Sequence, residues 1–152
     1  MQDVKLTPDS LGVFDLSIDD KQLAFVDGLQ TAIEVSLFTD ARAPDSLVPE
    51  ASRRRGWVGN IITSVQGREI GSLVWLLDQA RLTTSTMSSA KIYAKDATLH
   101  FIEDGVAREI NTSVIKGTRS VEIQIEIIIS DNLVERYNVL WRNTNAAGIS
   151  NI

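Results

Sequence analysis

The chain has 152 residues, 43% of them hydrophobic and 23% charged, a composition typical of one soluble globular domain. Its 15 Lys and Arg against 20 Asp and Glu give a net charge of −5, which argues against general nucleic-acid binding. The absence of cysteine excludes disulfides and thiolate metal sites and fits a reducing compartment. The chain does not begin like a secretory signal, and no apolar run approaches the ~20 residues that span a bilayer.

The N-terminal part predicts a β-hairpin followed by a helix. Apolar and polar residues alternate over 14–25 on both sides of a polar turn at 19–21, as in two short paired strands. Asp27 and Gln30 have the spacing of a capping box, which predicts that a helix begins there and ends near Thr39. The apolar positions of this helix are Leu29, Ala32, Ile33 and Leu37.

Residues 40–69 show little periodicity and are interrupted by prolines and glycines. A loop of this length is uncommon in a compact domain and is usually functional or disordered. Its middle, residues 53–59, reads Arg-Arg-Arg-Gly-Trp-Val-Gly. A basic, aromatic and glycine-rich segment of this kind usually contacts a ligand, a nucleic acid or another protein.

Two helices are predicted after this loop, a short one over 72–80 and a longer one over 84–104. Gly105 stands where a helix commonly ends with a C′ glycine. Apolar residues of the longer helix recur at spacings of three and four, and its alanines permit the close approach of a neighbouring backbone. They are Met87, Ala90, Ala94, Ala97 and Phe101.

The last third of the chain predicts an antiparallel meander. Strict alternation marks strands over 106–114, 121–129 and 133–141, separated by turns at 116–118 and 130–132. We therefore predict an α+β fold in one domain over 1–152, with the meander packed against two or three helices, an N-terminal hairpin and a long central loop. The polar end, residues 142–152, is predicted to be a mobile tail.

The sequence gives little support for catalysis or for a cofactor. His100 is the only histidine, and a structural role is favoured because it lies beside a core position at the end of a helix. No metal-ligand spacing and no phosphate-binding glycine loop is present. Carboxylate pairs such as Glu103 with Asp104, Glu69 with Asp78, or Asp15 with Asp19 are the remaining enzymatic option, and each has a structural explanation.

The central loop is the candidate site. Arginine and tryptophan are the residues most enriched at the energetic centres of protein interfaces, and local positive charge on an acidic protein suits a protein partner. A solvated loop face, or phosphate binding by the arginines, is the alternative. An uncovered edge of the meander that accepts a strand from another chain is a second contact device. The candidate docking residues are Arg53, Arg54, Arg55, Gly56, Trp57, Gly59 and Asn60.

Four stretches resemble the baseplate wedge proteins of Mu-like contractile-tailed phages, a family related to the lysozyme-like wedge protein of T-even phages. In the second stretch, Val58 and Asn60 stand where the family pattern has a second tryptophan and an aspartate. In the third, Leu73 follows Gly-Ser where the family often has an arginine. The stretches are 26–40, 54–60, 70–77 and 90–107.

The resemblance implies a structural subunit of the inner wedge ring that docks to other wedge subunits and helps to start sheath assembly. It implies no catalysis and no cofactor, nucleic acid, membrane or small-molecule substrate. The implied partners are other wedge proteins, the sheath protein by strand addition, and the tail tube. The implied location is the virion tail baseplate, assembled in the bacterial cytoplasm. A peptidoglycan-degrading lysozyme-like tail enzyme and a small cytoplasmic adaptor are the alternatives.

Overall fold

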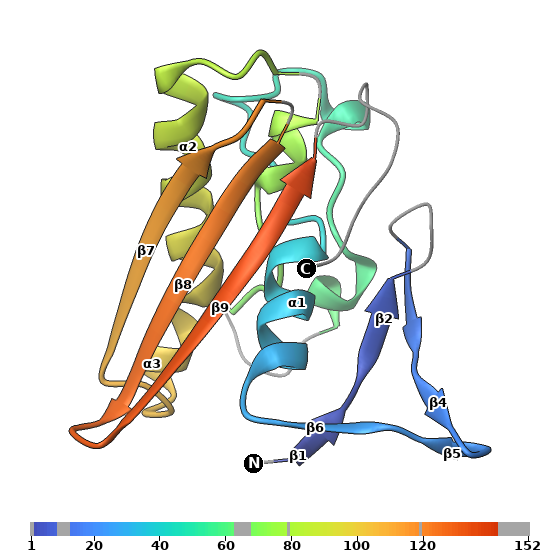
Figure 1. Cartoon of the computed structure of the whole chain (residues 1–152). Helices are drawn as coiled ribbons and strands as arrows, with labels where there is room; N and C mark the ends of the chain where they lie inside the picture. Colours follow the sequence, from blue (N-terminus) through green and yellow to red (C-terminus); the bar gives the residue numbers. More distant parts are fainter. Residues whose placement is uncertain (1, 9–12, 63–67, 79, 119, 143–152) are drawn as a thin grey trace.

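The computed structural model describes residues 2–8, 13–62, 68–78, 80–118 and 120–142. Its central feature is an antiparallel sheet in the order β7-β8-β9, built from β7 (Glu109–Lys116), β8 (Ser120–Ser130) and β9 (Leu133–Arg142). Helices cover one face of this sheet, as Figure 1 shows. The predicted α+β fold with a meander against helices is therefore confirmed. The predicted tail beyond Arg142 lies outside the described residues.

Alternation along β8 creates the core. Val121, Ile123, Ile125 and Ile127 are almost fully buried, whereas the residues between them point to the other side of the sheet. The first strand begins at Glu109, three residues later than the alternation predicts. The reason is that the backbone N–H groups of Val106 and Ala107 both donate to the carbonyl of Phe101 and extend the helix end.

The long predicted helix is present but divided into α2 (Thr84–Thr98) and α3 (His100–Glu103). The Thr83 side chain caps its start by accepting from the Thr86 N–H, and Gly105 follows its end with φ +70°. The buried alanines of α2 allow the helix to lie close to the sheet, behind β7 and β8 in Figure 1. The predicted helix over 72–80 is shorter, a single 3-10 turn, η3 (Val74–Leu77).

Helix α1 (Gln30–Phe38) forms and ends where the sequence predicts, and Leu29, Ile33 and Leu37 are buried. The predicted capping box is wrong. Asp27 belongs to strand β6 and pairs with Gln2, and the N-cap side chain makes no capping hydrogen bond to the described residues. The N-cap residue is Leu29.

A contact with β9 takes the place of the cap. The backbone N–H of Leu29 donates to the Tyr137 hydroxyl at 2.8 Å and to Glu135 Oε2 at 3.2 Å. The Tyr137 hydroxyl itself donates to Glu135. Burial, and then the hydrogen bond to Glu135, raise the pKa of Tyr137 to about 12. We call this contact of Gly28, Leu29, Glu135 and Tyr137 the α1–β9 clasp.

Residues 2–8 and 13–27 form a structure that we call the N-terminal arm. The predicted hairpin exists only at its tip, where β4 (Ile18–Asp19) pairs with β5 (Gln22–Leu23) around a turn at Asp20 and Lys21. The flanking strands pair instead with the first residues of the chain. Here β1 (Gln2–Val4) pairs with β6 (Phe25–Asp27), and β2 (Leu6–Pro8) pairs with β3 (Phe14–Leu16).

The three ribbons of the arm meet at one junction. The N–H of Lys5 donates to the carbonyl of Ala24, that of Ala24 to Ser17, and that of Ser17 back to Lys5, each at 2.9 Å. This closed ring of hydrogen bonds satisfies the backbone where the strands change partners. The arm therefore projects away from the sheet and helices, toward the lower right of Figure 1.

Candidate docking loop

The central loop is fastened to the end of α1. Asp40 and Ser72 form a parallel bridge, and the Ser72 hydroxyl donates to the Leu37 carbonyl at 2.5 Å. A side chain at Gly71 would come within 2.7 Å of the Thr39 carbonyl, and φ is +125° there, so only glycine fits. The segments at the start and just after the end of the loop, which are distant in sequence, are thereby held together beside the end of α1.

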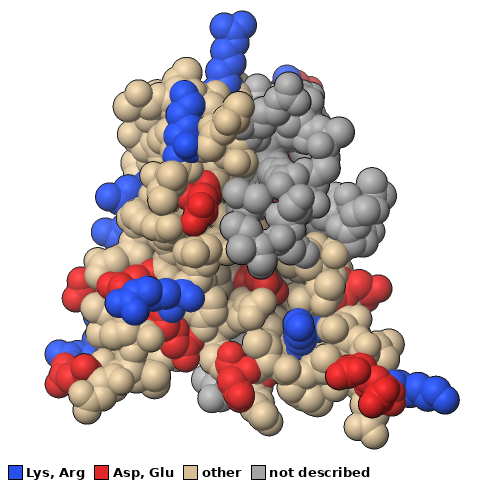
Figure 2. Space-filling view, in the orientation of Figure 1, with Lys and Arg blue, Asp and Glu red and all other residues tan. Residues whose placement is uncertain are grey.

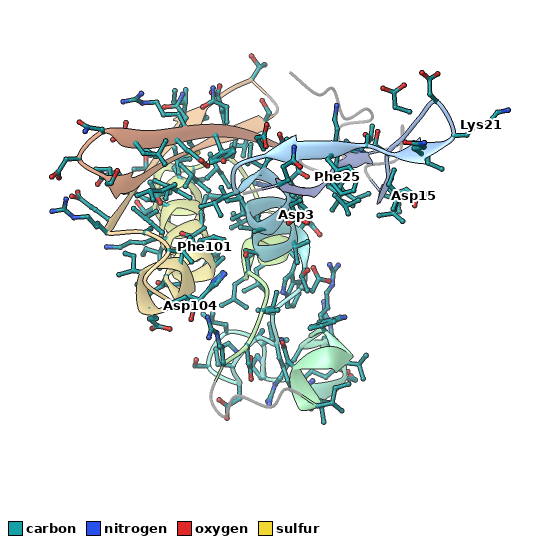
Figure 3. All side chains as sticks on the ribbon, turned by 90° about the horizontal axis from the view of Figure 1, so that it is seen from below. Asp3, Asp15, Lys21, Phe25, Phe101 and Asp104 are labelled. Carbon is teal, nitrogen blue, oxygen red and sulfur yellow. The ribbon has the colours of Figure 1, made fainter. Side chains whose placement is uncertain are left out.

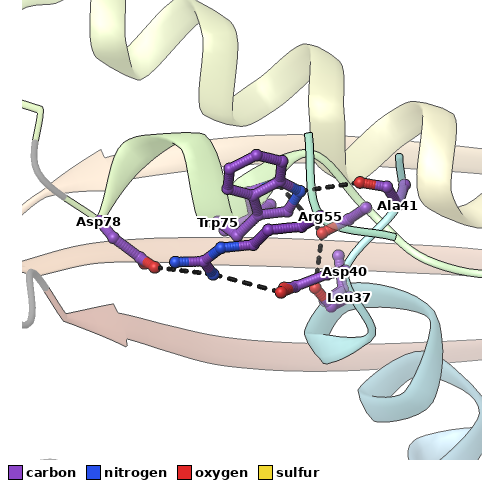
Figure 4. Close-up of polar contacts among 8 residues, drawn as sticks. Leu37, Asp40, Ala41, Arg55, Trp75 and Asp78 are labelled. Atoms are coloured by element: carbon purple, nitrogen blue, oxygen red, sulfur yellow. Dashed lines mark hydrogen bonds and ion pairs between the residues drawn. The ribbon is translucent and has the colours of Figure 1, made fainter. Parts of the chain in front are cut away.

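Arg55 lies at the centre of a polar cluster that Figure 4 shows. Its guanidinium lies 3.2 Å from Asp40 Oδ2 and 3.5 Å from Asp78 Oδ2. The same group lies 4.6 Å from the ring centroid of Trp75, whose indole N–H donates to the Ala41 carbonyl. Arg55 therefore joins the start of the loop, at Asp40, to η3 and the residue after it, and its φ of +48° is unusual for a residue with a side chain.

The arginine triplet divides into inward and outward side chains. Arg54 donates to the carbonyls of Val48 and Pro49, both at 2.8 Å, and so closes the turn before η1 (Ala51–Arg53). Arg53 points to solvent, with a side chain 75% exposed and a long contact to Glu50 at 4.0 Å. Two of the three predicted docking arginines thus organise the loop itself.

The two glycines and Asn60 also have identifiable structural roles. Gly56 adopts φ +114°, and an added Cβ would lie 2.9 Å from that of Arg42. The Trp57 ring lies over Gly59, where an added Cβ would come within 2.2 Å of it. Asn60 donates to the Ile70 carbonyl and accepts from the Ile70 N–H, both at 2.9 Å. These contacts fix the direction in which Trp57 and its neighbours face.

The outward side of this segment is apolar. Trp57 is 47% exposed, and Val58, Ile61 and Ile62 are between 71% and 83% exposed. They lie on or beside η2 (Val58–Ile61), and we call these four residues the apolar patch. The sequence analysis missed Val58, Ile61 and Ile62. The available signal was apolar residues in a loop with no core-facing periodicity.

The other candidate residues are explained by structural contacts. Asp104 pairs with Arg68 and Asp78 with Arg55, while Asp15 accepts from the N–H of Leu16. His100 is half-buried against Phe101, and burial is the main cause that lowers its pKa. Among the residues that the structure describes, no cluster of three or more His, Asp or Glu side chains could hold a metal ion. No described helix is long and apolar enough to cross a membrane.

Charge on the sheet side of the molecule is mixed. Figure 2 shows lysine and arginine side chains interspersed with aspartate and glutamate over the described part of this face. Pairs such as Arg136 with Glu126 and Arg108 with Asp131 contribute to this pattern. This face therefore lacks the continuous basic surface, within the described residues, that binding to nucleic acid requires.

Comparison with known proteins gives consistent matches. The model of the family "Phage protein GP46" matches residues 29–141. "Baseplate protein gp46" of Escherichia phage Mu is 41% identical over 85 residues, which cover 55% of this chain and 57% of that protein. "Mu-like prophage FluMu protein gp46" of Haemophilus influenzae is 30% identical over 137 residues, covering 90% of this chain and 93% of that protein. The family model covers α1, the loop and the meander up to residue 141, and the chain belongs to the GP46 family of phage proteins.

Proposed function

We propose that this chain is a structural, non-catalytic subunit of a contractile phage tail baseplate, and that it docks to neighbouring subunits through the loop Arg53–Asn60. The Mu relative, named a baseplate protein, supports the location in the tail. The observation that carries the docking role is the apolar patch on a loop that is fastened by the side chains of Arg55 and Asn60. An exposed apolar surface on a well-fastened segment is typical of a binding site.

The contacts within the loop separate the residues that would touch a partner from those that hold the loop in shape. Trp57 and the three aliphatic residues of the patch provide the apolar contact, and Arg53 provides charge at its border. Arg54, Arg55, Gly56, Gly59 and Asn60 hold the patch in place. The proposed partners are other wedge subunits of the inner ring around the tail tube.

The docking role is tested in a Mu-like phage whose own copy of this chain is replaced by a variant. Trp57→Ser with Ile61→Ser removes apolar contact and leaves the anchoring contacts of Arg54 and Asn60 in place. We expect a folded chain and a loss of complete tails by electron microscopy, because the partner loses its apolar contact. Ile92→Ser, which changes an apolar residue of α2 that is 55% exposed, is the matched control. Normal tails from the loop variant would overturn the docking role.

We further propose that an edge of the meander accepts a strand of the sheath protein and helps to start the sheath. In the described part of the chain, β7 and β9 each pair only with β8, which leaves two sheet edges unpaired. Because the chain has no cysteine, a single cysteine placed at Ser113 on β7 or Asn138 on β9 gives a clean cross-linking probe. Cross-linking to sheath protein in purified tails is expected from one edge, and its absence from both edges argues against strand addition.

A further inference from the structure

The tip of the N-terminal arm presents a second apolar surface. Ile18 and Leu23 lie opposite each other in the β4–β5 pair, so their side chains share one face. Leu16 ends β3 and Phe25 begins β6, so these two residues lie just beyond the junction, two positions from Ile18 and Leu23. All four side chains are exposed, Ile18 to 70%. We call these residues the arm face.

The base of the arm is fixed while its tip is free of the core. Phe14 packs against Phe38 of α1 with ring centroids 4.9 Å apart, and the Thr31 hydroxyl donates to the Val4 carbonyl at 2.6 Å. A two-stranded ribbon is marginally stable in water without an apolar surface to cover it. A fixed base with an exposed apolar tip is the arrangement of an arm that packs on another molecule.

Charge indicates what that molecule is. The described part of the arm carries five aspartates against Lys5 and Lys21, a balance of 2 − 5 = −3. Residues 40–62 of the loop carry four arginines against Asp40, Asp45 and Glu50, a balance of 4 − 3 = +1. The arm face and the apolar patch are thus both apolar, and their surroundings have opposite charge, which favours contact between them. The five aspartates are Asp3, Asp15, Asp19, Asp20 and Asp27.

We propose that the arm face of one copy of this chain docks on the apolar patch of a second copy, head to tail. The inference rests on the proposed docking role of the loop and names its partner. In Figure 3 the arm, with Lys21 near its tip, extends sideways, whereas the cyan-to-green loop segments lie below the helices. Since the two surfaces face different directions, the contact joins different chains and repeats, as a heterologous interface does.

The first test is sedimentation velocity of the purified full chain over rising concentration. Wild type is expected to form species larger than a dimer. Ile18→Ser with Leu23→Ser disables the arm face, and Val58→Ser with Ile61→Ser disables the patch. Each variant alone is expected to be monomeric, and an equal mixture is expected to form a one-to-one complex. Each copy in the mixture contributes the surface that the other lacks, which no unfolded variant reproduces. A wild type that stops at a dimer would overturn the head-to-tail arrangement, because a reciprocal two-fold contact closes at two copies.

A charge exchange gives a second test without loss of apolar surface. Asp15→Lys with Asp19→Lys reverses the sign of the net charge on the arm. Arg53→Glu reverses the charge at the border of the apolar patch. Either change alone is expected to weaken association at least ~tenfold, because like charges then face each other across the contact. The chain with all three changes is expected to recover association. Weakening that the triple variant does not reverse would overturn the charge argument, as would a wild type that stays monomeric up to millimolar concentration.

The outcomes separate this inference from the proposed function. If the loop variants abolish tails but wild type does not self-associate, the loop docks to a different protein and the head-to-tail contact is wrong. If the loop variants assemble normal tails, the docking role itself fails. If both self-association and tail assembly are lost in the arm and loop variants alike, the two surfaces serve the same contact.

Discussion

At the scale of single residues, Gly28 determines how closely α1 meets β9. It adopts φ +89°, and a Cβ there would lie 2.9 Å from both Glu135 Oε2 and the Tyr137 hydroxyl. The clasp therefore requires glycine for two reasons, the backbone conformation and the space. Gly28 belongs to one of the stretches that resemble the wedge family. Its role in the structure is to let the Leu29 N–H reach the Tyr137 hydroxyl.

Gly28→Ala is expected to destabilise the chain by about 2–3 kcal/mol, since the strain of a positive φ adds to the clash with the clasp. Gly105→Ala is the matched control. It also has a positive φ of +70°, but nothing lies within 4 Å of its added Cβ, so it carries only the backbone strain of about 1 kcal/mol. Urea unfolding of both variants measures the difference. Equal losses of stability in the two variants would show that the side chains of Glu135 and Tyr137 move aside without a measurable energetic cost.

Glu34 gives a pH-dependent prediction. Burial is the main cause that raises its pKa, and the hydrogen bond from Gln30 and the charge of Lys5 offset part of that effect. Its Oε2 atom is buried with no hydrogen-bond partner among the described residues. A raised folded pKa means that the carboxyl contributes stability when protonated, and that this contribution is lost as pH rises through the folded pKa.

Glu34→Gln is therefore expected to be more stable than wild type at neutral pH, by less than ~1 kcal/mol because the group is only half-buried. The gain should shrink as pH falls toward the ordinary glutamate value of 4.5. Glu109→Gln, on the exposed side of β7, is the control for loss of one negative charge. Thermal unfolding from pH 4 to 8 measures the stability of both variants. A gain in the stability of Glu34→Gln that grows as the pH falls would contradict the raised pKa of Glu34.

At the scale of elements, alternation made the meander and the buried face of α2 predictable, because one periodic pattern determines each of them. The contacts of the arm were not predictable in this way. Strands of two or three residues carry too little pattern, and Val4 pairs with Phe25 far along the chain. The capping box failed because Asp27 pairs as a strand residue before the helix begins.

The candidate loop shows the same limit. The sequence singled out this segment as a candidate, but the types of Arg53, Arg54 and Arg55 could not show which arginine faces inward. That depends on Asp40 and Asp78, which are distant in sequence and come near only when the loop folds. The exposed aliphatic residues beside Trp57 were overlooked because apolar residues are normally assigned to the core.

The backbone of the loop allows a direct test at Arg55. Arg55→Ala and Arg55→Gly both remove the ion pairs and the contact with Trp75, but only glycine relieves the positive φ of +48°. Arg55→Gly is therefore expected to be about 1 kcal/mol more stable than Arg55→Ala. At Glu50, where φ is −78°, the order should reverse because glycine there only adds flexibility to the unfolded chain. Urea midpoints of the four variants decide it, and the same order at both sites would contradict the strained backbone.

At the scale of the whole molecule, the arm and the remainder of the chain are unequal in their contribution to the core. The core cluster begins at Leu29 and draws on α1, η3, α2, α3 and the meander. The arm is joined to it through the Phe14–Phe38 pair, the hydrogen bond from Thr31 and the strand that leads into α1. No described residue of the arm belongs to the core cluster, so the core of the remainder of the chain does not depend on the arm.

Deletion of residues 2–26 is therefore expected to leave a chain that still unfolds in one cooperative transition. The expected loss is about 1–3 kcal/mol, the sum of one hydrogen bond and one aromatic pair. The clasp of Leu29 with Tyr137 should survive, because its residues all remain. Phe14→Ala in the full chain is the control that removes only the aromatic pair. Circular dichroism and urea unfolding measure both variants. A truncated chain that loses the cooperative transition would show that the arm is part of the fold. A folded truncated chain that stays monomeric at concentrations where the full chain associates would show that the arm serves association.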